Sequence, residues 1–164
     1  MTPATSYKTA DLYDKYGRDL AICKPLFIDY GGNKSFNGQI RTLKCFEDNS
    51  KVREMLGEPG NGNVLVVDAG GSLRCAMLGD LLAQMAVDNG WSGVLMNGCI
   101  RDSDEIGEMP LGVKALATHP AKSEKRGIGD VDVPVTFACT EFKPGDYLYA
   151  DGDGIVVSDK PLTL

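Results

Sequence analysis

Two short segments in the middle of the chain are almost continuously apolar, NVLVVDAGG at residues 63–71 and WSGVLMNG at residues 91–98. Runs of this length are typical of strands that are covered on both faces. Between them, residues 73–90 carry an apolar stripe at helical spacing and end at a glycine that stops a helix. The stripe consists of Leu78, Leu81, Leu82, Met85 and Ala86. A strand, a helix and a second strand in this order predict a βαβ unit with parallel strands.

Two further helices are predicted nearer the N-terminus. Residues 9–16 form the first, with Thr9 as its N-cap and Gly17 as its stop. The second ends at Pro59-Gly60, and its apolar positions at helical spacing are Val52, Met55 and Leu56. Its candidate caps are Asp48, Asn49 and Ser50.

Extended segments make up most of the remaining chain. Residues 25–32 and 36–46 read as strands around a glycine-rich turn, and the chain from residue 111 onward is β-rich. Turns interrupt that last part at residues 143–146 and 151–154. We therefore expect an α/β fold with a mixed, partly parallel sheet, in a single domain that spans residues 1–164.

The amino-acid composition limits the kinds of partner that we expect the protein to bind. The 164 residues are 43% hydrophobic and carry a formal net charge of -6. Nucleic-acid binding depends on clustered Lys and Arg, so we expect no direct contact with nucleic acid. The chain shows neither a secretory signal nor a membrane span, so we expect a cytoplasmic protein that contacts no membrane. The five cysteines are spread without a C-x-x-C, and we expect them to be reduced core residues.

The chemistry concentrates in GCIRDSDEIGEM, residues 98–109, directly after the second apolar run. Arg101 and Asp102 follow the carboxyl end of a predicted parallel strand, which is where open α/β sheets bind ligands. A second carboxylate, Asp80, precedes Arg101 on the predicted helix. Carboxylate oxygens suit Mg²⁺ or Mn²⁺, and a guanidinium suits the carboxylate or carbonyl of a 2-oxo acid. A solvated loop with an internal Arg–Asp pair is the alternative that spacing leaves open.

Other polar residues have simpler interpretations. His119, the only histidine, has no local catalytic partner and is expected to be structural. Asp104, Glu105 and Glu108 begin a short helix whose dipole favours acids, with a second metal shell as the alternative. DGDG at residues 151–154 reads as a hairpin turn rather than a calcium loop, and DAGG lacks the G-x-G-x-x-G of a dinucleotide site.

Three long stretches resemble the class II aldolase/RraA-like family. They are PLFIDYGGNKSFNGQIRTLKCFEDN, VLVVDAGGSLRCAMLGDLLAQMAVDNGWSGVLMNGCIRD and GIGDVDVPVTFACTEFKPGDYLYADGDGIVVS. The resemblance implies a swivelling β/β/α-type domain that assembles as a homotrimer with sites between protomers. It also implies one of two functions. Some members are metal-dependent aldolases that cleave 4-hydroxy-4-methyl-2-oxoglutarate or 4-carboxy-4-hydroxy-2-oxoadipate to pyruvate products and decarboxylate oxaloacetate. Others are regulators that bind and inhibit ribonuclease E.

The resemblance also implies roles for individual residues. Asp102 matches the aspartate that holds the divalent cation, and Arg101 matches the arginine that contacts substrate. The substrate-binding start of the helix is matched by Gly79, Asp80, Leu81 and Leu82. Asp80, acting through a metal-bound water, is the candidate base, a step for which larger aldolases use a glutamate from a neighbouring protomer. Regulators typically lack the acid at the position of Asp102, so this set of residues favours the aldolase, with the ribonuclease E regulator as the alternative.

Overall fold

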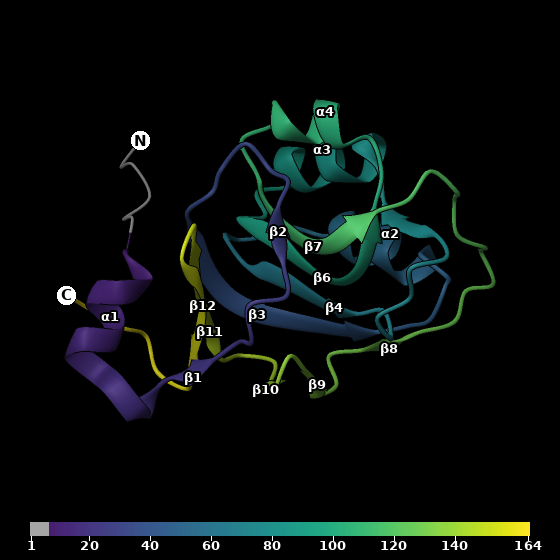
Figure 1. Ribbon diagram of the computed structural model, residues 1–164. Coiled ribbons are helices and arrows are strands. Elements are labelled where there is room, and N and C mark those ends of the chain that lie inside the picture. Colours follow the sequence, from purple (N-terminus) through teal and green to yellow (C-terminus); the bar gives the residue numbers. More distant parts are fainter. Residues whose placement is uncertain (1–6) are drawn as a thin grey trace.

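A computed structural model describes residues 7–164 as a mixed α/β fold built on one large sheet (Figure 1). Neighbouring strands in this sheet are joined in the order β1-β12-β11-β3-β4-β6-β7-β2. Strand β5 pairs with β6, β8 pairs with β3, and β9 and β10 form a separate hairpin.

The residue ranges of the elements are as follows. The first six strands are β1 (Ala21–Ile22), β2 (Ile28–Asp29), β3 (Phe36–Lys44), β4 (Val64–Asp68), β5 (Ala76–Leu78) and β6 (Gly93–Ile100). The others are β7 (Gly112–Thr118), β8 (Asp130–Val131), β9 (Val135–Phe137), β10 (Thr140–Phe142), β11 (Tyr147–Asp151) and β12 (Gly154–Ser158). The helices are α1 (Thr9–Tyr16), the 3-10 turn η1 (Gly17–Asp19), α2 (Ser50–Leu56), α3 (Asp80–Asp88) and α4 (Ser103–Gly107).

The centre of the sheet is parallel, as the βαβ pattern predicts. Strands β3, β4, β6 and β7 run in parallel, whereas β11, β12, β1, β2 and β8 join by antiparallel pairing. Helix α2 connects β3 to β4, and α3 lies between β4 and β6 in the chain. The carboxyl ends of the parallel strands therefore meet at one edge of the sheet, and the loops that follow them lie close together.

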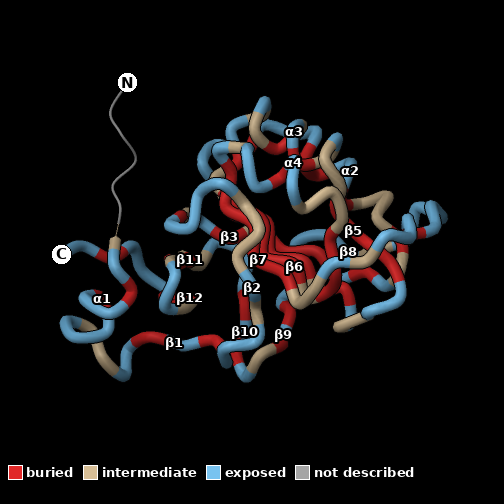
Figure 2. The backbone as a smooth tube through the Cα atoms, turned by 45° about the horizontal axis from the view of Figure 1, so that its top comes forward, coloured by how far each residue is buried: buried red, intermediate tan, exposed pale blue. Residues whose placement is uncertain are grey.

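Both faces of the parallel strands are covered, which explains their continuous apolar sequence. On β4, Leu65 and Val67 belong to the core beneath the helices, whereas Val64 and Val66 belong to the core against β9–β12. In Figure 1, α3 and α4 lie above the sheet and the β9–β10 hairpin lies below it, and Figure 2 shows the buried strands between these layers. The prediction of an α/β fold with a mixed, partly parallel sheet is confirmed.

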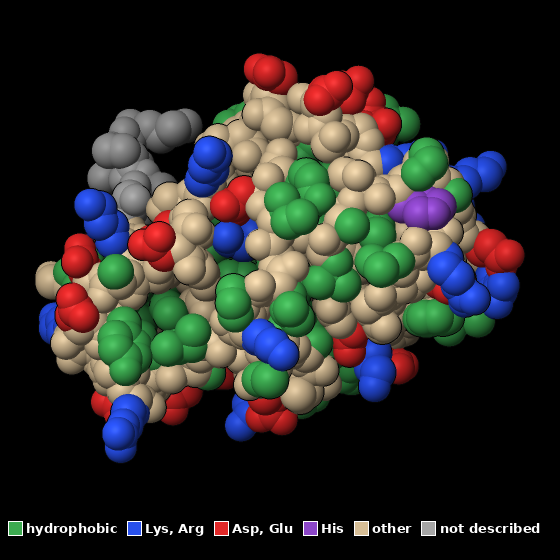
Figure 3. Space-filling model, viewed as in Figure 1, with side chains coloured by type: hydrophobic (Ala, Val, Ile, Leu, Met, Phe, Trp, Pro, Cys, Tyr) green, Lys and Arg blue, Asp and Glu red, His purple; other side chains and the backbone are tan. Residues whose placement is uncertain are grey.

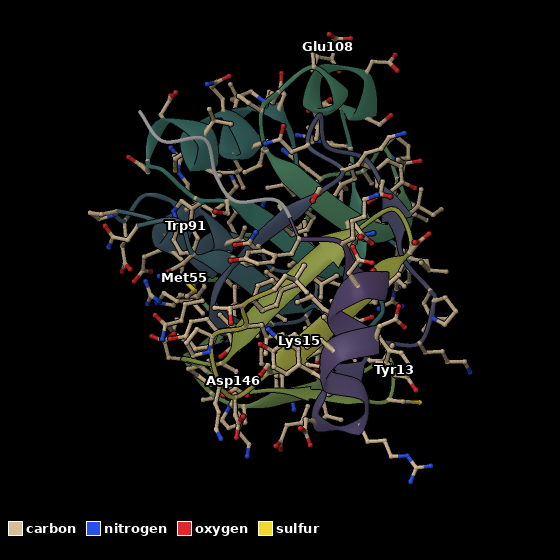
Figure 4. All side chains as sticks on the ribbon, turned by 90° about the vertical axis from the view of Figure 1, so that its left-hand side faces the viewer. Tyr13, Lys15, Met55, Trp91, Glu108 and Asp146 are labelled. Atoms are coloured by element: carbon tan, nitrogen blue, oxygen red, sulfur yellow. The ribbon has the colours of Figure 1, made fainter. Side chains whose placement is uncertain are left out.

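Helix α1 packs on the far side of β11 and β12 rather than on the main core. Leu12 is fully buried there with Tyr149 and Val156, and Figure 4 shows Tyr13 and Lys15 on the same helix. The predicted bounds are confirmed, but the predicted cap is wrong. Lys8 is the N-cap residue. The Thr9 hydroxyl instead donates to Asp151 Oδ1 at 2.7 Å, which ties the helix to the end of β11.

The long helix predicted for residues 73–90 is wrong in its first half. Ala76–Leu78 form strand β5, which pairs in parallel with the end of β6, and the helix spans only Asp80–Asp88. Sequence periodicity cannot separate a short buried strand from a buried helical turn, and pairing with β6 decides the outcome here. The apolar stripe is also partly wrong, because Leu81 is 81% exposed.

The predicted hairpin turn and the predicted buried cysteines are largely confirmed by the structure. The turn at residues 151–154 joins β11 and β12 as a hairpin, as expected. Four cysteines are free and buried, but Cys139 is free and exposed, so the expectation of five core cysteines is wrong at that position. Trp91 is buried, and its indole N–H donates to the carbonyl of Glu58 at 3.1 Å, beside the α2 core residue Met55 (Figure 4). Within residues 7–164, no helix has the length and apolar character needed to cross a bilayer.

Candidate functional site

A cleft of about 140 Å³ opens where β5 and β6 end. All six residues singled out from the sequence line it, namely Gly79, Asp80, Leu81, Leu82, Arg101 and Asp102. The other lining residues are Asn49, Ser50, Arg53, Ala76, Lys122, Ser123 and Lys125. The structure thus brings the whole predicted set to one place, and it adds a group of residues that sequence analysis missed.

Two backbone junctions bring Asp80 and Asp102 together. Strands β5 and β6 are neighbours, and the N–H of Arg101 donates to the carbonyl of Leu78 at 2.9 Å. The chain then enters α3 on one side and α4 on the other. The N–H of Asp80 donates to Asp102 Oδ2 at 2.9 Å, so the Asp102 carboxylate is held against the first residue of α3.

Asp102 has an unusual backbone conformation. Its φ of 57° and ψ of 43° lie in the left-handed region, which few residues other than glycine, asparagine and aspartate adopt without cost. It is the N-cap residue of α4, yet its side chain makes no capping bond to that helix. The carboxylate points to α3 instead, which is the direction of the cleft.

Gly79 permits this close approach. A Cβ at position 79 would lie 3.0 Å from Asp102 Oδ2 and 3.4 Å from Arg101 Nε. The φ of Gly79, -121°, is accessible to any residue, so the need for glycine here is one of space and not of backbone freedom. The Gly79-Asp80 pair is therefore linked sterically to the Arg101-Asp102 pair.

The missed residues add positive charge to the cleft. Arg53 comes from α2, and Lys122 and Lys125 come from the loop between β7 and β8. Together with Arg101 they are four cations, and within residues 7–164 none of them forms an ion pair with a carboxylate. Figure 3 shows Lys and Arg side chains around the single histidine, on the flank that this loop forms. The basic run KSEKR at residues 122–126 was a weak indication of two of these cations. No pattern in the sequence predicted that this run would lie near Arg101.

A buried aspartate fixes the loop against α2. Asp48 is 3% exposed and accepts hydrogen bonds from the N–H groups of Ser50, Arg126 and Ile128 and from the Ser50 hydroxyl. Burial alone would raise the pKa of the Asp48 carboxyl, but these hydrogen bonds outweigh it and lower the pKa to about 2. Of the three candidate caps, Asn49 occupies the N-cap position but makes no side-chain capping bond. Asp48 instead accepts from the N–H of Ser50, the first residue of α2, and it also anchors the loop.

The donor set of the cleft fits a hydrated divalent cation better than a closed metal cage. Within residues 7–164, no three His, Cys, Asp or Glu side chains are grouped as a metal site. Asp102 Oδ1 and the Asp80 carboxylate have no hydrogen-bond partner among these residues, so both can serve as ligands. Mg²⁺ keeps several waters and is commonly held by one or two carboxylates together with an anionic substrate.

The remaining candidate residues lie outside the cleft. Asp104, Glu105 and Glu108 do not line it. The predicted short helix is confirmed as α4 with Asp104 and Glu105 in its first turn, but Glu108 is its C-cap residue, so the prediction that Glu108 starts the helix is wrong. Figure 4 shows Glu108 pointing away from the molecule beyond this helix. His119 Nδ1 accepts a hydrogen bond from the N–H of Ala121 at 3.1 Å, which is a structural contact within the loop. Asn49 Oδ1, in the cleft wall, is a buried acceptor without a partner in the described chain.

Comparisons with known sequences identify close relatives. The sequence model of a family described as "RraA-like: Aldolase/RraA" matches residues 9–157. Relatives from Pseudomonas fluorescens (strain Pf0-1) and Ectopseudomonas mendocina (strain ymp), each named "Putative 4-hydroxy-4-methyl-2-oxoglutarate aldolase", are 55% and 56% identical to the chain over 158 residues. These alignments cover 96% of the chain and 97% and 98% of the two relatives.

Solved structures share the fold under different names. The S-adenosylmethionine:2-dimethylmenaquinone methyltransferase from Geobacillus kaustophilus HTA426 is 51% identical, with a TM-score of 0.93, and the match covers 95% of the chain and 97% of that structure. The RNA-processing inhibitor RraA from Thermus thermophilis is 45% identical, also with a TM-score of 0.93, and the match covers 97% of the chain and 96% of that structure.

The relatives' names describe three different activities on one fold, so overall similarity does not decide between them. Any choice has to rest on the residues of the cleft. What the matches establish is the family, because they extend over nearly the whole chain at high identity. The chain belongs to the RraA-like family, described as Aldolase/RraA.

Proposed function

We propose that this protein is a divalent-metal-dependent aldolase that cleaves 4-hydroxy-4-methyl-2-oxoglutarate, or 4-carboxy-4-hydroxy-2-oxoadipate, to pyruvate products. The observation that carries the proposal is the joint placement of Asp80, Arg101 and Asp102 in one cleft, with the Asp102 carboxylate held against the start of α3. The relatives named as aldolases support the same reaction class. Decarboxylation of oxaloacetate proceeds through the same pyruvate enolate, so we propose it as a side activity.

The pyruvyl half of the substrate would bind at the start of α3. The N–H groups of Leu81 and Leu82 are in the first turn and have no partner within the helix, and they suit a carboxylate oxygen. The Arg101 guanidinium, next to Gly79, would contact the 2-oxo group. As the C3–C4 bond breaks, its electron pair moves toward the C2 carbonyl, and Arg101 offsets the negative charge that develops there.

A base must take the proton of the C4 hydroxyl during cleavage. We assign this role to Asp80, acting through an ordered water, because its carboxylate lines the cleft without a hydrogen-bond partner among the described residues. The C4 alkoxide then becomes the carbonyl of one pyruvate, and the enolate of the other takes a proton from water. General-base catalysis by a positioned side chain contributes about 10²- to 10⁴-fold to rate.

Asp102, together with water, would hold the divalent cation, Mg²⁺ or Mn²⁺. When bound, the cation would supply Lewis-acid stabilisation of negative charge on the substrate's oxygens. The test follows pyruvate release with Mg²⁺, with a chelator, and in Asp102→Asn, and it measures Mn²⁺ binding by calorimetry. Asparagine tolerates the left-handed backbone of position 102 and can still accept from the Asp80 N–H, so the variant removes charge with little change of shape.

We expect chelation and Asp102→Asn each to abolish turnover, and we expect the variant to lose Mn²⁺ binding. Asp104→Asn is the matched control, because that residue lies two positions along in α4 and outside the cleft. Turnover no faster than that of the free metal would rule out the proposed reaction.

Two further proposals come from the family. We propose a homotrimer with sites between protomers, and the exposed Leu81 at the rim of the cleft is consistent with cover from a neighbour. Light scattering of the purified protein measures the assembly. The alternative function, binding and inhibition of ribonuclease E, is favoured by the likeness to the Thermus RNA-processing inhibitor. If no pyruvate is released, a direct binding titration with ribonuclease E becomes the deciding measurement.

A further inference from the structure

We infer that a second pocket, between β2, β7 and the turn that joins β11 to β12, binds a small free amino acid in its zwitterionic form. This pocket has a volume of about 110 Å³, and none of its lining residues belongs to the cleft. Its charged lining residues are Lys24, Asp29, Lys114 and Asp153. The inference is independent of the proposed function, because no residue assigned to the aldol reaction takes part in it.

The pocket lies near the starts of the parallel strands, whereas the cleft lies beyond their ends. Lys114 is on β7 and is aligned with Leu95, near the start of β6, while Arg101 follows the end of β6. Leu95 belongs to the core against β9–β12, and aligned residues of neighbouring strands point to the same face of a sheet. The Lys114 side chain therefore enters the layer between the parallel strands and the β11–β12 hairpin.

The buried charge of Lys114 is the first argument. The residue is 3% exposed, and lysines are almost never buried so completely unless they are paired. Its ammonium donates to Asp29 Oδ1 at 2.9 Å and to the carbonyl oxygen of Asp151 at 2.8 Å. An ammonium has three N–H groups, so one donor remains, and Asp29 Oδ2 accepts no hydrogen bond within residues 7–164. Both residues line the pocket, which therefore offers a ligand one donor and one acceptor.

The second argument is the balance of charge around the pocket. Lys24 and Asp153 are exposed at its rim, and neither forms an ion pair in the part of the chain that the structure describes. With Lys114 and Asp29 they make two cations and two carboxylates, so the lining has no net charge. A ligand with a single charge meets a like charge as well as an opposite one. A zwitterion pairs its carboxylate with the lysines and its ammonium with the aspartates.

Apolar residues complete the pocket and limit the side chain of the ligand. Phe27 and Ile155 line it and belong to the core against β9–β12, Ile155 as a buried member and Phe27 as a partly buried one. Binding sites for small molecules commonly combine such an apolar wall with a few polar groups that fix orientation. A short aliphatic side chain suits this wall, so alanine is the amino acid to test.

The experiment titrates the isotopically labelled 164-residue chain with L-alanine, with propionate and with ethylamine, and follows the backbone amide signals by NMR. Propionate lacks the ammonium of alanine and ethylamine lacks its carboxylate, while both keep a short carbon chain. The amides of Gly152 and Gly154 report on this pocket. The amides of Leu81 and Leu82 report on the cleft, so binding at the two places is distinguished.

We expect alanine to shift the signals of Gly152 and Gly154 saturably. It should bind at least about tenfold more tightly than propionate or ethylamine, because each analogue loses charge-assisted hydrogen bonds, and such bonds are of that strength. The signals of Leu81 and Leu82 should change less than those of the two glycines.

Variants of the charged residues test the contacts. Lys24→Met and Asp153→Asn each remove one exposed charge and should weaken alanine binding about three- to tenfold. The paired change of Asp29→Asn with Lys114→Gln removes both buried charges but keeps two groups that can hydrogen-bond to each other, and it should abolish binding. Lys34→Met is the matched control, because Lys34 is an exposed lysine outside the pocket. Thermal melting reports whether each variant folds.

Any of three results would overturn the site. The first is a lack of saturable shifts at Gly152 and Gly154, and the second is equal affinity for alanine and its two analogues. The third is a set of shifts confined to Leu81 and Leu82, which would place the amino acid in the cleft. If the paired variant does not fold, the two rim variants decide, because alanine binding at full strength by both excludes the proposed contacts.

Discussion

The two sides of the cleft are built in contrasting ways. The side formed by β5–α3 and β6–α4 is close-packed, with a backbone hydrogen bond from Asp80 to Asp102 and with Gly79 in near contact with the Asp102 carboxylate. The side formed by α2 and the β7–β8 loop exposes long basic side chains, Arg53, Lys122 and Lys125, without ion pairs in the described chain. The first side has the fixed geometry that bond cleavage requires, and the second has the charge that attracts an anion. Changes on the first side should therefore affect turnover, and changes on the second should affect affinity.

The largest expected effect distinguishes the roles of Asp80 and Asp102, the two carboxylates on the close-packed side of the cleft. We expect Asp80→Asn to lower kcat by about 10²- to 10⁴-fold while Mn²⁺ still binds, because the variant removes the proposed base. Asp102→Asn should lose Mn²⁺ binding together with turnover. Calorimetry measures Mn²⁺ binding by both variants, and pyruvate release measures their turnover. If the two variants behave identically in both measurements, the division of roles between the carboxylates is wrong.

The next effect tests the packing at Gly79. In Gly79→Ala the new methyl group would lie 3.0 Å from Asp102 Oδ2, so the carboxylate must shift. We expect kcat/KM to fall by about tenfold or more, since displacement of a positioned group by a fraction of an ångström is costly in a fixed site. Gly152→Ala is the control, because a Cβ at that position meets no atom within 4 Å. A fully active Gly79→Ala enzyme would show that the close approach is not required.

A stability effect tests the anchor between α2 and the loop. Asp48→Asn should lower the free energy of unfolding at neutral pH by about 1 to 3 kcal/mol, because it weakens hydrogen bonds to a buried carboxylate. The pKa of Asp48 is lowered on folding from about 4 to about 2, so its contribution is complete above pH 4 and is lost as the pH falls toward 2. Urea unfolding across this range should show the two proteins converging at low pH. A difference that stayed constant with pH would exclude the charged carboxylate as the cause.

The smallest effect concerns salt and the exposed side of the cleft. Interactions with exposed cations are screened as ionic strength rises. We expect the affinity for 2-oxoglutarate to fall about two- to fivefold between low and high salt, and the affinity for 2-oxopentanoate, which lacks the second carboxylate, to fall less. An equal decrease for both would place the salt-sensitive contacts at the pyruvyl end instead.

The sequence predicted those parts of the fold in which one short segment carries a clear pattern of apolar residues. The runs around Val64 and Val94 are almost continuously apolar, because each strand is covered on both faces, and this pattern identifies them as buried strands. The glycines and polar residues after them marked the ends of these strands. Prediction failed at Ala76–Leu78, where a three-residue strand precedes the helix, because so short an apolar run has no period that separates the two structures.

The candidate site divides along the same line. The sequence by itself determined that Arg101 and Asp102 would follow the end of a parallel strand, because they come directly after a recognisable apolar run. It placed Asp80 inside a longer helix, and the family resemblance named the roles of all three. Only the tertiary structure decided that Asp80 is the first residue of α3, directly after β5. Only the tertiary structure decided that Arg53, Lys122 and Lys125 share their cleft and that Leu81 is exposed. These facts depend on contacts between segments far apart in the chain, anchored at Asp48, and no local pattern records such contacts.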